Sequence, residues 1–163
     1  MKKIDKDLNL PIVRKLTEND KEIFLNMRMA YIWDSFDDVA QNQADEIASH
    51  LRIYFDEHIN KDDFIAIVCE ISGIPVSIAF LIISNKPANP GFVDGRVGTV
   101  MNVYTVPEYR GKGFATMILK DLISEAKERK LGLINLLSTD QGYDIYKRLG
   151  FEDDEDKAME MRL

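Results

Sequence analysis

The stretch that decides the fold covers residues 103–115 and reads VYTVPEYRGKGFA. Its first half continues a run of β-branched and aromatic residues and predicts a strand over 97–106, which a proline then ends. Its second half has two glycines, Gly111 and Gly113, in a turn. Apolar residues then recur with helical spacing and predict a helix over about 113–129. The sequence therefore predicts a strand, a glycine-bearing turn and an amphipathic helix in direct succession.

The turn has the properties of an anion-binding site. The first N–H groups of a helix have no partner within the helix, and its N-terminus carries a partial positive charge. Glycine has no Cβ, so a ligand can approach the backbone closely at Gly111 and Gly113. Arg110 and Lys112 add two cations. Together these features predict a cradle for a phosphate group.

Two common nucleotide motifs fit this turn poorly. The P-loop pattern G-x-x-x-x-G-K-[ST] is absent from the sequence. The dinucleotide pattern G-x-G-x-x-G would start at Gly111 and Gly113, but it has Thr116 in its third position. Binding of a nucleoside triphosphate therefore has little support.

Periodicity predicts the remaining elements. Residues 84–95 hold two prolines and two glycines and are expected to form a loop, and the acidic run 152–156 a hairpin loop. The expected elements are strand 12–16, helices near 23–28 and 42–58, a hairpin of 64–71 and 75–83, strand 97–106, helix 113–129, strand 133–137, helix 143–149 and a last strand 158–163. This order predicts an α+β fold in which a mixed, mostly antiparallel central sheet has helices on both faces.

Composition narrows the class of protein. The 163 residues, 45% hydrophobic and 30% charged, fit a single globular domain over residues 1–163. The net charge of −7 argues against nucleic acid or an anionic membrane as partner. No apolar run is long enough for a membrane span, and the charged start from Met1 to Leu10 lacks a signal peptide's apolar segment, so a cytoplasmic location is expected. The single cysteine, Cys69, is expected in the core, and no metal site is expected.

Two motifs give the chain a family resemblance. Arg110, Gly113 and Ala115 match the pattern [QR]-x-x-G-x-[GA], and residues 146–151 read YKRLGF, which matches Y-x-x-x-G-F. With these motifs and its order of elements, the chain resembles the GNAT acetyltransferases over nearly its whole length. The resemblance implies an N-acetyltransferase that uses acetyl-CoA as cosubstrate and needs no metal.

The resemblance also implies positions for the cosubstrate. The pantetheine arm would pair, like an added strand, with the main chain of Tyr104, Thr105 and Val106. Tyr146 matches the tyrosine that is usually the general acid and protonates the leaving thiolate. The pyrophosphate of coenzyme A would lie on the turn formed by Arg110, Gly111, Lys112, Gly113, Phe114 and Ala115.

The residue that acts as general base in many family members has no equivalent in this chain. Many members have a glutamate on the strand before the turn, whereas this chain has Asn102, which cannot accept a proton. An amine with a pKa near 10.4 must lose a proton before it attacks. Glu70, Asp94, Asp140 and a chain of water molecules all stay open as candidates.

The acceptor is expected to be a small basic amine. Residues 31–38 read YIWDSFDD and hold three aromatic residues and three acids between the first two helices. Aromatic faces and carboxylates together suit a cationic amine. The alternative is that the aromatic rings pack on the core and the acids cap the second helix. Because the resembled family is often dimeric, a homodimer is also an expectation.

A non-catalytic module that binds or senses acyl-CoA is the alternative function on this fold. The absent strand glutamate favours that module, whereas Tyr146 favours an enzyme. The two functions differ in a simple observation, because only an enzyme releases free coenzyme A when an amine is added.

Overall fold

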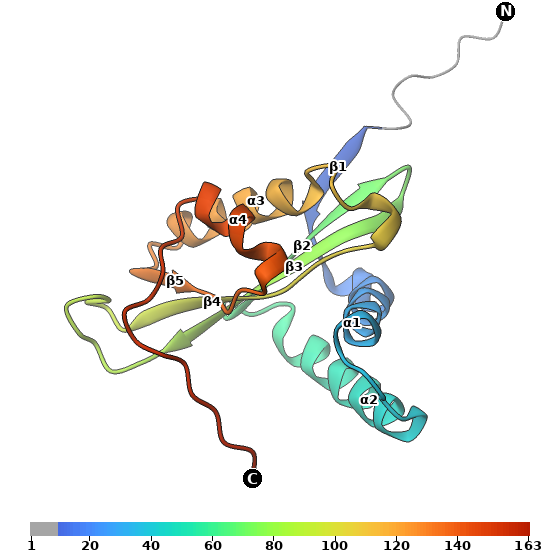
Figure 1. The fold of residues 1–163 in the computed structure, drawn as a ribbon, viewed down its shortest axis with the longest axis horizontal. Helices are drawn as coiled ribbons and strands as arrows, with labels where there is room; N and C mark the ends of the chain where they lie inside the picture. Colours follow the sequence, from blue (N-terminus) through green and yellow to red (C-terminus); the bar gives the residue numbers. More distant parts are fainter. Residues whose placement is uncertain (1–9) are drawn as a thin grey trace, which may run out of the picture.

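The computed structural model describes residues 10–163, so the expectations for 1–9 lie outside the described residues. The predicted elements appear in the predicted order up to the last helix (Figure 1). They are β1 (Pro11–Lys15), α1 (Lys21–Ser35), α2 (Gln41–His58), β2 (Phe64–Ile71), β3 (Ile74–Asn85), β4 (Arg96–Thr105), α3 (Phe114–Glu128), β5 (Leu133–Asn135) and α4 (Asp140–Arg148).

The strands form one sheet in the order β1-β2-β3-β4-β5. The first four strands pair antiparallel, and only β5 pairs parallel, with β4. A parallel pair needs a crossover connection, and α3 provides it. The prediction of a mixed, mostly antiparallel sheet is confirmed.

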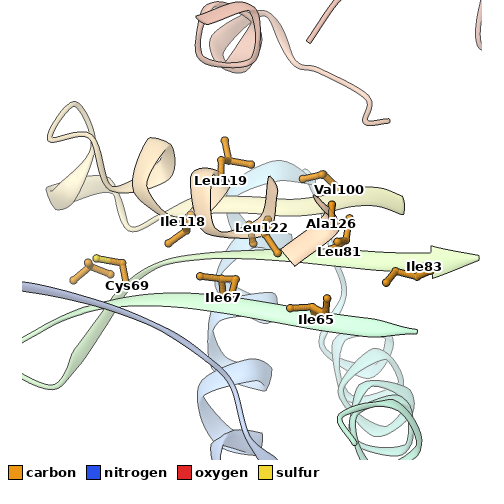
Figure 2. Close-up of a cluster of buried hydrophobic side chains, with 12 residues drawn as sticks. Ile65, Ile67, Cys69, Leu81, Ile83, Val100, Ile118, Leu119, Leu122 and Ala126 are labelled. Carbon is orange, nitrogen blue, oxygen red and sulfur yellow. The ribbon is translucent and has the colours of Figure 1, made fainter. Parts of the chain in front are cut away.

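Alternation along β2 divides the core into two layers. Phe64, Ala66 and Val68 pack with the layer under α1 and α2, whereas Ile65 and Ile67 pack under α3. Figure 2 shows the second layer, where the side chains from β2 and β3 lie beneath those of α3. Successive side chains of a strand point to opposite faces, so the helices cover both faces of the sheet, as expected. The expected core position of Cys69 is confirmed, because the residue is fully buried in the α3 layer.

A bulge interrupts β4 near its end. Between the pairs Ile78–Tyr104 and Phe80–Met101, one residue of β3 opposes two residues of β4. One of these two, Asn102, has a φ of +52°, in the left-handed region. Such bulges bend a strand and end regular pairing on one side. β4 is therefore irregular just before its last residues, which lead to the glycine turn.

The prediction of a last strand over 158–163 is wrong, and so is the prediction of a hairpin loop at 152–156. The chain after α4 forms no strand and stays exposed. The Asp153 carboxylate accepts hydrogen bonds from Tyr143 Oη at 2.9 Å and from Lys147 Nζ at 3.2 Å. These contacts hold the start of the segment against α4 and away from the edge of β5. The β5 strand itself has only three residues and so presents a short template for pairing.

Candidate active site

One edge of β4 is open where the strand approaches the glycine turn. β5 pairs with β4 only over residues 97–99. Thr99 Oγ1 donates to Asn135 Oδ1 at 2.8 Å at the end of this pairing. Beyond it, residues 100–105 have no strand partner on that side among the described residues. The two strands therefore separate and leave main-chain donors and acceptors of β4 free for a ligand.

The main chain at the end of β4 points alternately to β3 and to the open edge. The carbonyl of Tyr104 accepts from Ser77 Oγ at 3.0 Å, and the N–H of Val106 donates to the carbonyl of Val76 at 2.9 Å. Both groups therefore face β3. Since neighbouring residues of a strand present their polar groups to opposite edges, Thr105 faces the open edge. Of the three predicted pairing residues, Thr105 is the one with its main chain turned outward.

The turn before α3 has the backbone that a phosphate cradle needs. Gly111 and Gly113 have φ values of +74° and +86°, and a Cβ built on either would meet nothing within 4 Å. Gly113 is the N-cap of α3 and has no side chain with which to cap it. The first helical hydrogen bond comes from the N–H of Met117. The N–H groups of Phe114 and Ala115 are therefore free within the helix, in an open space of positive potential.

The two cations of the turn are held by local contacts. Arg110 Nε donates to the carbonyl of Thr105 at 2.9 Å, and its Nη2 pairs with Asp34 of α1 at 2.5 Å. Lys112 Nζ donates to the carbonyl of Glu108 at 3.1 Å. Both side chains are thus kept beside the turn. The pyrophosphate of coenzyme A carries negative charge, and these residues fit it by charge and by space.

Tyr146 comes to the same region from α4. Its half-buried ring packs against Phe151 with ring centroids 5.8 Å apart. Burial raises the pKa of its phenol, and the nearby phenol of Tyr31 raises this pKa further. Tyr31 belongs to α1 on the other face of the sheet. Residues from both faces of the sheet therefore influence the pKa of this phenol.

Gly142 is a site residue that the sequence analysis missed. A Cβ at this position would lie 2.9 Å from Cε2 of Tyr146 and 3.5 Å from Thr139 Oγ1. The absence of a side chain makes room for the phenol ring. Gly142 lies one helical turn before Tyr146, and this i, i+4 spacing is the signal in the sequence that could have indicated the contact.

Asn102 and Arg28 form a second contact across the site. Arg28 Nη1 of α1 donates to Asn102 Oδ1 at 2.8 Å. Asn102 is only 6% exposed, and its Nδ2 has no hydrogen-bond partner. The position where the family often has a glutamate thus holds a buried amide that is bonded to an arginine.

The candidate general bases lie in different parts of the molecule. Glu70 accepts two hydrogen bonds from Arg14 at 2.8 and 3.1 Å, on a strand that does not neighbour β4. Asp94 precedes β4 and accepts from the N–H of Arg96, at the far end of the strand from the opening. Asp140 begins α4, is exposed, and lies on the same helix as Tyr146. Only Asp140 shares an element with the candidate acid.

Residues 31–38 divide between the two expected roles. Ile32 is buried, whereas Trp33 and Phe36 are 48% and 56% exposed, so these two rings do not belong to the core. Asp34 pairs with Arg110, and the N-cap of α2 is Ala40. The expectation that the acids cap α2 is therefore wrong, since that position holds no carboxylate.

Comparison with known proteins bears on this site. The model of the acetyltransferase (GNAT) family matches residues 28–151, which include β4, the glycine turn and Tyr146. The chain belongs to the acetyltransferase (GNAT) family. Among the described residues, no group of three His, Cys, Asp or Glu side chains could hold a metal ion, and no helix is long and apolar enough to cross a membrane.

Individual GNAT relatives support the same assignment. An uncharacterized N-acetyltransferase of Methanocaldococcus jannaschii is 27% identical over 149 residues. The match covers 88% of this chain but only 61% of that protein. The crystal structure of a predicted acetyltransferase with acetyl-CoA from Clostridium acetobutylicum is 26% identical, with a TM-score of 0.83 and coverage of 94% and 96% of the two chains. A GCN5-related N-acetyltransferase from Ralstonia eutropha shares the fold at 19% identity, with a TM-score of 0.80 and coverage of 93% and 99%.

Proposed function

We propose that the protein transfers the acetyl group of acetyl-CoA to the amine of a small basic acceptor. The observation that carries the proposal is the uncapped N-terminus of α3. It follows two glycines with positive φ and lies beside the open edge of β4. Free N–H donors at a helix N-terminus bind phosphate, and an open strand edge binds an extended amide chain. Coenzyme A has both groups in one molecule.

The pyrophosphate would lie on residues 110–115, and the pantetheine arm would pair with the outward N–H of Thr105, whose carbonyl accepts from Arg110 Nε. The thioester carbonyl then lies near residues 103–105, where a strand N–H can stabilise the negative charge that develops on its oxygen. The acceptor enters from the side of α1, where exposed rings and acids favour a cation.

The transfer needs no reactant besides acetyl-CoA and the amine. The neutral amine attacks the thioester carbonyl, an N–C bond forms, and the C–S bond breaks. The leaving thiolate takes a proton from Tyr146, and the attacking nitrogen loses a proton to Asp140 or to water. An ordinary phenol is protonated at neutral pH, and the raised pKa of Tyr146 keeps it so; its proton is therefore available to the thiolate.

A thermal-unfolding experiment with acetyl-CoA, coenzyme A and ATP in parallel tests the cosubstrate. Ligand at roughly 100 times its dissociation constant adds about 2.7 kcal/mol of stability. For a chain of this size that raises the midpoint by about 5–10 °C. We expect the shift with both coenzyme A species and none with ATP. No shift with either species would overturn the proposal.

Release of free thiol in the presence of an amine panel tests the reaction. An enzyme releases coenzyme A from acetyl-CoA only when an acceptor is present. Binding of acetyl-CoA without thiol release for any amine would favour the non-catalytic acyl-CoA-binding module instead. The strand position at which many family members have a glutamate holds Asn102, and this observation keeps the alternative open.

A further inference from the structure

Arg28 is a half-buried cation of α1 that has no counter-ion in the described part of the chain. No carboxylate among residues 10–163 lies within ion-pair distance of its guanidinium. It donates one hydrogen bond to Asn102 and lies over the ring of Tyr31, 5.1 Å from the centroid. Burial lowers the pKa of Arg28, yet a guanidinium stays charged at neutral pH. A buried charge without a partner costs stability, so this arrangement calls for a reason.

Two of the three other partly buried arginines of the described chain are paired with acids. Arg14 meets both Asp20 and Glu70 at 2.8 Å, and Arg129 meets Glu125. The third, Arg96, has no acid within ion-pair distance among residues 10–163 and donates to the carbonyl of Arg129 at 2.9 Å. Arg28 differs from Arg96 in its place, because its partner Asn102 lies on β4 where the edge of that strand is open.

The free donors of Arg28 remain within reach of a ligand. A guanidinium has five N–H donors, and Nη1 is the one nitrogen of Arg28 with an acceptor among residues 10–163. Its Nε and Nη2 are not among the buried nitrogens that lack a partner, so both are still open to solvent. The acceptor of this bond, Asn102, belongs to the bulge of β4 and has a φ of +52°, a conformation that asparagine adopts readily.

Arg28 is also close to the expected reaction centre. Its partner Asn102 precedes the strand residues 103–105, which would receive the thioester, and each strand residue spans about 3.3 Å. Its other neighbour, Tyr31, acts on the pKa of Tyr146. An anionic group on Arg28 would therefore be a few bonds from an amine that attacks the thioester.

We propose that the acceptor is a small amine that also carries a carboxylate a few bonds from its nitrogen, as in an amino acid. The carboxylate pairs with the free N–H groups of Arg28, whose planar fork matches its two oxygens. The exposed acids Asp37 and Asp38, which follow α1, favour the ammonium end. This inference rests on the proposed acetyl transfer and narrows its acceptor to one class.

The test measures acetylation of matched acceptor pairs by the full chain. The panel holds the twenty standard amino acids and β-alanine, each beside its amide and its decarboxylated amine. We expect one or more amino acids to be acetylated, with kcat/KM on the order of 100-fold above that of the matched amide and amine. Thermal shifts with acetyl-CoA are measured on the same samples. Absence of such a shift would overturn the acetyl transfer itself. A shift together with faster acetylation of the amines that lack a carboxylate would overturn the acceptor class alone.

Arg28→Gln tests the residue, with Arg28→Lys as the conservative variant. For the amino acid that is acetylated, Arg28→Gln should raise KM on the order of 100-fold and leave the acetyl-CoA shift in place. Lysine should restore part of the affinity. The control is Arg52→Gln, which removes an exposed cation of α2 that pairs with Glu22 and should change neither value. An equal loss with the matched amide, or acetylation of no panel member by a protein that binds acetyl-CoA, would contradict the proposal.

Discussion

At the scale of single residues, Tyr146 combines burial with access to the opening of the sheet. Its raised pKa has desolvation as the main cause and the phenol of Tyr31 as the second. A raised pKa keeps the phenol protonated as pH rises through the neutral range, and the acid form is lost only above the ordinary value of about 10. The residue is thus in the state that a proton donor requires.

Tyr146→Phe should lower kcat on the order of 10–100-fold, with little change in acetyl-CoA affinity. The loss is limited because a thiol with a pKa near 8.5 needs only modest help to leave. The measurement is thiol release from pH 6 to 9, and the ratio of the two proteins should stay large throughout. Equal turnover of both proteins across this range would remove Tyr146 from the mechanism.

Gly142→Ala should lower turnover without a loss of acetyl-CoA binding. The new Cβ lies 2.9 Å from the ring of Tyr146, so the phenol has to move. Gln141→Ala, next to it on an exposed position of α4, is the matched control and should behave as the wild type. If Gly142→Ala keeps full activity, the position of the ring is not set by this contact.

At the scale of elements, the proposed phosphate cradle at the turn into α3 consists of backbone N–H groups. Gly113 is both the N-cap of the helix and a residue with φ of +86°. An L-residue in the left-handed region costs roughly 1–2 kcal/mol, and its side chain would enter the space above the free N–H groups. An alanine at Gly113 would therefore both strain the backbone and exclude the ligand. The two effects can be measured apart, because an alanine at a second glycine of the chain would strain the backbone only.

Gly113→Ala should weaken binding of acetyl-CoA at least about tenfold, which corresponds to about 1.4 kcal/mol. Gly73→Ala is the matched control, because Gly73 has φ of +76° and an equally open Cβ position in the turn between β2 and β3. Calorimetric titration gives the affinities, and thermal unfolding gives the stability. Both variants should lose similar stability, and unchanged affinity in Gly113→Ala would argue against the cradle.

At the scale of the whole molecule, an ion-pair network joins β1, β2 and the entry to α1. Arg14 lies between Asp20 and Glu70, and the Asp20 carboxylate also accepts from the N–H of Thr17 at 2.7 Å. These hydrogen bonds, with that from Arg14 first, lower the pKa of Asp20 to about 2. Because the folded state lowers the pKa of Asp20, its ionised carboxylate stabilises the fold at pH values above the ordinary pKa of about 3.9. This stability is lost as pH falls toward 2.

The free energy of unfolding should therefore fall between pH 5 and pH 2. Asp20→Asn should cost roughly 2 kcal/mol at pH 7 and should reduce the further loss in acid. Denaturant unfolding at several pH values measures both effects. Asp56→Asn, which removes an exposed partner of Lys21, is the control and should change little. The same acid-induced loss in Asp20→Asn as in the wild type would contradict this account.

The segment after α4 gives a prediction about assembly. Met159 and Met161 are 96% and 83% exposed, and β5 is an edge strand of the sheet. Since an unpaired edge and an alternating apolar segment can pair between two copies, we expect a homodimer in solution. The double change Met159→Asp and Met161→Asp should shift the molar mass measured by light scattering to the monomer, and Lys157→Gln should not. A monomeric wild type would refute the expectation.

The sequence by itself determined the elements from β1 to α4 and the glycine turn before α3. These features depend on neighbours along the chain: alternation in β2, helical spacing in α3, and glycines at a helix start. The family assignment followed from the same local motifs, and the match over residues 28–151 confirms it.

Only the tertiary structure decided which distant side chains meet. The hydrogen bond between Arg28 and Asn102 joins residues that are 74 positions apart, and Tyr31 and Tyr146 pack in the core layers on opposite faces of the sheet. The segment 158–163 has the alternation of a strand, but a strand needs a neighbour to satisfy its backbone, and in the described fold this segment pairs with no strand. Pairing and burial depend on three-dimensional neighbours, and the local pattern of a sequence does not contain them.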